Sequence, residues 1–163
     1  GKSADETSEM WLVSGDDKED LKRLEEHLRQ GKHALWLLPK RQEALSLLDQ
    51  KIQIKSCGDL FFAAADGAYG SYPLGMLYNA KKDYIDATAD HTIQTEFSGE
   101  TLIYTYDKSG FQGSKGAKPH RAFVKKCSAE GGTLILCSLA REGRVGYNIG
   151  LDELLLDILE QEG

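Results

Sequence analysis

The stretch that decides the predicted fold reads Gly131-Gly132-Thr133-Leu134-Ile135-Leu136-Cys137-Ser138-Leu139, and after a short gap it is followed by Leu151-Asp152-Glu153-Leu154-Leu155-Leu156-Asp157-Ile158-Leu159. An apolar run directly after two glycines is typical of a buried strand. The leucine spacing in the second segment predicts a helix that packs against this strand. The side chains expected to be buried are Leu151, Leu154, Leu155 and Ile158.

A second unit of the same kind opens the chain, with the helix before the strand. Leucines at helical spacing predict a helix over 16–30, and Gly31 supplies the left-handed residue that ends it. The apolar run at 33–38 predicts a strand that is covered on both faces of a sheet. A short strand is expected at 10–13, before the helix.

The remaining elements are expected in the following order. We predict a second helix at 42–50, strands at 52–55, 60–65 and 101–106, and a hairpin of 121–127 with 133–139, while 81–95 fits a helix and a strand equally well. The predicted fold class is α/β: an open, mostly parallel sheet flanked by helices, with a C-terminal β-hairpin and helix. Residues 10–163 are expected to form one domain, and 1–9 a disordered tail.

Composition excludes several function classes. The 163 residues carry a formal net charge of −6 with acids and bases interspersed, which argues against a nucleic-acid binder because such a protein needs a basic face. No apolar stretch approaches the roughly 20 residues of a membrane-spanning helix. The chain begins with Gly1 instead of Met, which is typical of a trimmed start whose signal peptide was left off. We therefore expect a periplasmic or extracellular location ahead of a cytoplasmic one.

Two segments carry a family resemblance. The chain from Leu24 to Lys32 resembles the helix that leads into a core strand in glutamine-amidotransferase-like (flavodoxin-like) domains. The closing stretch, from Phe123 through Gly131-Gly132 to Leu139 and the leucine-rich helix, is similar to the end of such domains in bacterial glycoside hydrolases of the β-galactosidase kind. Tyr72-Pro73-Leu74 matches a short proline-containing segment of those domains. The resemblance implies a packing or spacer module that lacks the catalytic cysteine.

The chemistry-bearing residues agree with a non-catalytic domain. The chain has no G-x-C-x-G elbow, and its three cysteines offer no zinc motif. Cys57, in a loop beside Asp59, is the candidate nucleophile if the protein is an enzyme, whereas Cys137 fits a small buried side chain. Neither a metal nor another cofactor is expected.

A glycine- and tyrosine-rich loop at 66–75 holds the candidate ligand-binding residues. Asp66, Tyr69 and Tyr72 could stack on a sugar and hydrogen-bond to its hydroxyls, although tyrosines that merely cover a sheet edge fit the pattern as well. Three functions stay open: a non-catalytic accessory or binding domain of carbohydrate-processing proteins, a small cysteine-dependent hydrolase or transferase, and an acidic, inhibitor-like partner-binding protein. A carbohydrate or a protein is the expected partner, and an open sheet edge near the hairpin could pair two copies in a homodimer.

Overall fold

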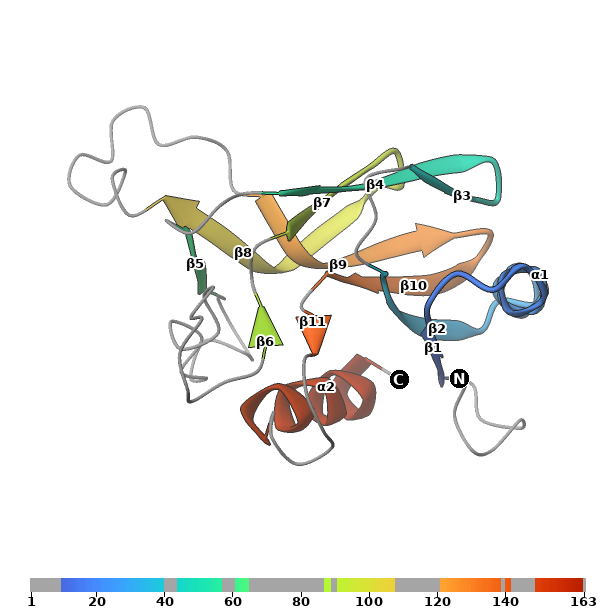
Figure 1. Ribbon diagram of the computed structural model, residues 1–163. Coiled ribbons are helices and arrows are strands. Elements are labelled where there is room, and N and C mark those ends of the chain that lie inside the picture. Colours follow the sequence, from blue (N-terminus) through green and yellow to red (C-terminus); the bar gives the residue numbers. More distant parts are fainter. Residues whose placement is uncertain are drawn as a thin grey trace.

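The computed structural model describes residues 10–39, 44–56, 61–64, 87–88, 91–107, 121–138, 140–141 and 149–162. Strands predominate, and two helices accompany them in this part of the chain (Figure 1). The elements are β1 (Met10–Ser14), α1 (Lys18–Arg29), β2 (His33–Leu37), β3 (Leu45–Leu47), β4 (Gln50–Ser56), β5 (Phe61–Ala64), β6 (Ala87–Thr88), β7 (His91–Thr95), β8 (Gly99–Asp107), β9 (Arg121–Ala129), β10 (Gly132–Cys137), β11 (Ala140–Arg141) and α2 (Ile149–Glu162).

The main sheet is mixed and strongly curled into a half-barrel. Its strands follow the order β1-β2-β10-β9-β7-β4-β3, with β8 paired to both β9 and β5. Only β1, β2 and β10 run parallel, whereas every other pairing in the sheet is antiparallel. The predicted open, mostly parallel α/β sheet flanked by helices is therefore wrong, because the chain continues from its parallel start into antiparallel hairpins that curl the sheet.

The parallel part of the sheet is built by the β1–α1–β2 unit. Asp17 begins the helix by accepting hydrogen bonds from the N–H groups of Glu19 and Asp20 at 2.9 and 3.2 Å. Gly31, with φ +78°, turns the chain from the helix into β2, as the sequence predicts. Strand β10 then pairs with the free side of β2. The predicted strand–helix–strand opening is confirmed, with α1 starting two residues later than expected.

Helix α1 closes the open side of the curled sheet. Its Leu24 and Leu28 are fully buried in a core that contains Trp36 of β2 and Leu134 of β10. Strands at the other end of the sheet and the turn after β7 contribute to the same core: Leu45, Leu47, Ile52, Ile54 and Ile93 from the strands, and Phe97 from the turn. Since both ends of the sheet contribute to one core, α1 lies between them as a bridge (Figure 1).

The predicted helix at 42–50 is wrong in its described part. Residues 45–47 form β3, in which buried Leu45 and Leu47 flank the exposed Ser46, and a two-residue turn leads directly into β4. This alternation places both leucines on the core face of a sheet. The predicted strand at 52–55 is confirmed as the centre of β4.

The predicted C-terminal hairpin is confirmed as β9–β10, and it lies in the middle of the sheet. Strand β10 also pairs with β2, and β9 also pairs with β7 and β8. The prediction of an open sheet edge near this hairpin, at which two copies could pair, is therefore wrong. Along the described path of the sheet the end strands are β1 and β3.

Helix α2 lies across the opposite face of the sheet from α1 (Figure 1). Ile158 is fully buried, Leu155 is half-buried, and Leu156 is 60% exposed. Near the end of α2 the Glu162 carboxylate pairs with the Lys126 ammonium of β9 at 2.5 Å. The expected burial is thus confirmed for Ile158, and the side chains of Leu151 and Leu154 lie outside the described part.

Other predictions are met where the structure describes them. The strand predicted at 101–106 is confirmed within β8, and the one at 60–65 is confirmed over β5. The undecided region 81–95 contains strands β6 and β7, and its other residues lie outside the described ones, as does the tail 1–9. Within the described ranges, no helix combines the length and apolar character that crossing a membrane requires.

Candidate functional site

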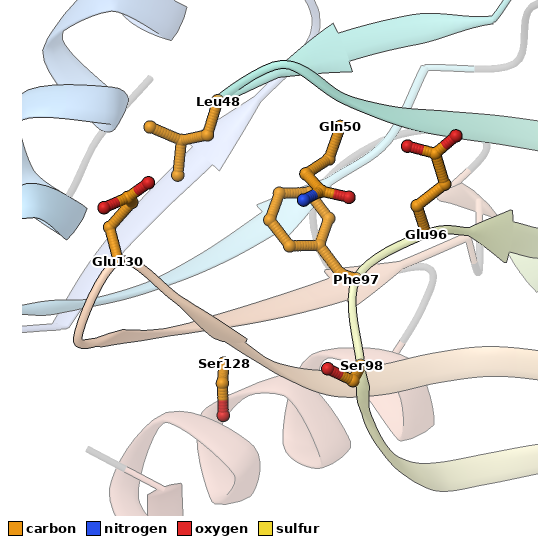
Figure 2. Close-up of a pocket in the computed structure, with 7 residues that line it drawn as sticks. All are labelled: Leu48, Gln50, Glu96, Phe97, Ser98, Ser128 and Glu130. Carbon is orange, nitrogen blue, oxygen red and sulfur yellow. The ribbon is translucent and has the colours of Figure 1, made fainter.

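A small pocket lies where three turns of the sheet come together (Figure 2). Its volume is about 120 Å³. The lining residues are Leu48 and Gln50 from the β3–β4 hairpin, Glu96, Phe97 and Ser98 between β7 and β8, and Ser128 and Glu130 from the β9–β10 hairpin. Four of the seven, Glu96, Ser98, Ser128 and Glu130, are exposed, so the pocket is shallow.

Two of the three turns hold residues other than glycine in a left-handed conformation. Both hairpins have two-residue loops, Leu48-Asp49 and Glu130-Gly131, with positive φ at each loop position. The values are +51° and +60° in the first turn and +50° and +88° in the second. Such type I′ turns favour Asn-Gly, and a leucine there carries conformational strain. Strain of this kind is found at functional sites more often than elsewhere.

The third turn is fixed by hydrogen bonds to β4. The Thr95 hydroxyl donates to the carbonyl of Lys51 at 2.8 Å and accepts the N–H of Phe97 at 3.2 Å. The N–H of Glu96 also donates to the Lys51 carbonyl, at 3.3 Å. These bonds seat Phe97, which is only 5% exposed, in the core beneath the pocket.

The pocket presents mainly hydrogen-bonding groups, and very little apolar surface is open to it. The Gln50 amide both donates and accepts, the Glu96 and Glu130 carboxylates accept, and the Ser98 hydroxyl does both. The Ser128 hydroxyl points away from Leu48 and Gln50, toward α2 (Figure 2). Phe97 and Leu48 supply the apolar atoms (Figure 2). This set can recognise a neutral polar ligand. Among the described residues, no three His, Cys, Asp or Glu side chains gather in a group that could hold a metal ion.

The site residues predicted from the sequence lie elsewhere. Cys57, Asp66, Tyr69 and Tyr72 all fall outside the described residues, so their roles stay predictions. Cys137 is fully buried in β10, which confirms its interpretation as a core side chain. Cys127 is also buried; burial raises the pKa of its thiol to about 11, and the nearby charge of Lys125 opposes this shift. A high pKa disfavours the reactive thiolate.

Sequence reasoning missed the pocket for an identifiable reason. Its residues come from three segments that are at least 30 positions apart, and the segment around Leu48 carries no glycine to mark its turn. The pattern Leu45-Ser46-Leu47 before Leu48 and Ile52-Gln53-Ile54 after it could have indicated a hairpin at this point.

No protein-family model matches this chain, and a search of the curated proteins finds no match either. The resemblance to amidotransferase-like domains therefore rests on the sequence segments alone, and the fold it implied is wrong.

Proposed function

We propose that this chain is a non-catalytic binding domain of a carbohydrate-processing protein, and that it binds one neutral sugar residue in the pocket between the three turns. The observation that carries the proposal is the polar lining: the Gln50 amide, the Glu96 and Glu130 carboxylates and the Ser98 hydroxyl. A sugar ring offers a rim of hydroxyls, which can donate to and accept from such groups. That the domain belongs to a carbohydrate-processing protein rests on the sequence resemblance alone.

The size and exposure of the pocket set the expected affinity. Sites that enclose drug-sized ligands have volumes of roughly 300–1,000 Å³, so a pocket of about 120 Å³ fits a single sugar residue at most. Most of the lining is exposed, and hydrogen bonds there replace existing bonds to water. We expect a dissociation constant of about 1 mM, which corresponds to roughly 4 kcal/mol.

The test is a titration of the ¹⁵N-labelled protein with D-galactose and D-glucose, followed by NMR. Saturable shifts should concentrate at the amides of 48–50, 96–98 and 128–130. D-Galacturonate should bind about five- to tenfold more weakly, because each carboxylate at roughly 5 Å in water repels it by about 1 kcal/mol before salt screening. If no neutral sugar causes saturable shifts at these amides, the proposed function is wrong.

A further inference from the structure

Helix α1 contacts both of the strained turns that border the pocket. Glu25, half-buried on α1, accepts a hydrogen bond from the backbone N–H of Leu48, with Oε2 and N 2.7 Å apart. Just beyond the C-terminal end of α1, the carbonyl of Lys32 accepts the N–H of Thr133 in the β9–β10 hairpin at 3.3 Å. Gly132 approaches so closely that an added Cβ would lie 2.1 Å from the Lys32 carbonyl oxygen. One helix thus connects the turn that carries Leu48 with the turn that carries Glu130.

The contact at Leu48 supports a conformation that leucine disfavours. Leu48 is the first of the two loop residues, and its φ is +51°. The pair Leu47–Gln50 closes the ladder of the hairpin, so the N–H of Leu48 requires an acceptor from outside that ladder. A carboxylate is the strongest acceptor a side chain offers to a backbone N–H. Because Leu48 itself lines the pocket, whatever holds this turn also holds one wall of the site.

We propose that Glu25 is a positioning residue for the pocket: its carboxylate clamps the Leu48 N–H, keeps the β3–β4 turn left-handed, and so fixes Leu48 and Gln50 opposite the turn of Glu130. Glu25 does not line the pocket and acts only through Leu48. The effect on ligand affinity rests on the proposed function. The effect on the turn does not, since it is a property of the unliganded protein.

The test compares Glu25→Ala with Glu26→Ala, a change at the neighbouring residue on the same helix. Alanine favours the helix, so neither change weakens α1 through helix propensity. Hydrogen exchange of the Leu48 amide should become at least about tenfold faster in Glu25→Ala, since a hydrogen bond to a charged group contributes that much or more. The Gln50 and Glu130 amide resonances should shift, and the dissociation constant for D-galactose should rise by about threefold or more. Glu26→Ala should leave all three unchanged.

A second pair of variants separates the clamp from a general loss of stability. Asparagine is favoured at the first position of a type I′ turn, so in a Leu48→Asn background Glu25→Ala should accelerate amide exchange at position 48 much less. Glu25→Gln keeps the shape of the side chain and a neutral acceptor. Its rate of amide exchange at Leu48 should therefore lie between those of the native protein and Glu25→Ala.

Three results would contradict the proposed role of Glu25 or the proposed function on which its effect on affinity rests. Unchanged Leu48 exchange in Glu25→Ala would overturn the clamp. Faster exchange with unaltered D-galactose affinity would overturn the positioning role. If D-galactose fails to bind the native protein, the proposed function fails, and amide exchange and the shifts of Gln50 and Glu130 still decide whether Glu25 holds the turn.

Discussion

Replacing Gly132 by alanine tests whether α1 is seated against the β9–β10 hairpin. Gly132 opens β10, next to the segment that follows α1. An added Cβ would lie 2.1 Å from the carbonyl oxygen of Lys32 and 3.0 Å from that of Leu28. Both neighbours are backbone atoms, so no side-chain rotation can relieve the clash. The end of α1 and the hairpin must move apart by about 1 Å to restore ordinary contact.

The expected cost follows from the contacts that this movement disturbs. Overpacking a well-packed interior typically costs about 1–3 kcal/mol. The hydrogen bond from Thr133 to the Lys32 carbonyl is already long at 3.3 Å and would be lost, adding about 1 kcal/mol. We therefore expect Gly132→Ala to lower the free energy of unfolding by about 2–4 kcal/mol. For a chain of this length that corresponds to a fall in Tm of roughly 5–15 °C.

Urea unfolding followed by circular dichroism measures this difference, with Gly131→Ala as the matched control. Gly131 has φ +88°, and a methyl group added there would meet open space, since no atom lies within 4 Å of its Cβ position. Its substitution carries only the left-handed penalty of about 1–2 kcal/mol. If Gly132→Ala costs no more than Gly131→Ala, then α1 does not press against the hairpin, and the bridge between the two turns is refuted.

Two further predictions concern the other side of the sheet and the buried thiol. Ile158→Ala should lower the free energy of unfolding by about 2–5 kcal/mol, because this fully buried side chain anchors α2. Leu156→Ala, at a side chain that is 60% exposed, should change it by less than about 0.5 kcal/mol. Equal effects of the two changes in urea unfolding would show that Ile158 is not part of the core. Burial raises the pKa of Cys127 from the ordinary 9.0 to about 11 in the folded protein. Between these values the folded protein keeps a proton that the unfolded chain has lost, so the free energy of unfolding declines as the pH rises. The contribution of Cys127 to stability is complete below pH 9 and declines by about 1 kcal/mol per pH unit up to pH 11. Cys127→Ala should therefore lose stability less steeply over this range, and identical slopes in the two proteins would contradict the raised pKa.

The local elements of this fold are predictable wherever the chain marks their ends. Leucines at helical spacing followed by Gly31 define α1, and Gly131-Gly132 defines the turn between β9 and β10. The turn between β3 and β4 carries no such mark, because Leu48-Asp49 adopts a conformation usually left to Asn and Gly. The sequence pattern consequently predicts a helix in place of this hairpin, since Leu45, Leu47 and Leu48 also fit a helical face.

The curl of the sheet depends on pairings that no local pattern specifies. Ile54 pairs with Ile93, and Ile93 with Ala122, across long separations in the chain. Strand β8 also pairs with β9 through two shifts in register, between Thr101 and Ile103 and between Ile103 and Tyr104. Such irregularities bend a sheet and depend on tertiary packing. The pocket could not be predicted from local sequence patterns either, because it exists only where the curl of the sheet brings three distant turns together.

Binding of D-galactose to the native protein, to Gln50→Ala and to Gln53→Ala is the most direct test of the central claim. Both glutamines are half-buried on β4, but only Gln50 lines the pocket. Under the proposed function the Gln50 amide makes about two hydrogen bonds to the sugar. Without them, the dissociation constant measured by NMR titration should rise by about fivefold or more. Gln53→Ala should bind as the native protein does. Equal affinity of all three proteins, or no saturable binding at millimolar sugar, would contradict a sugar site between the three turns.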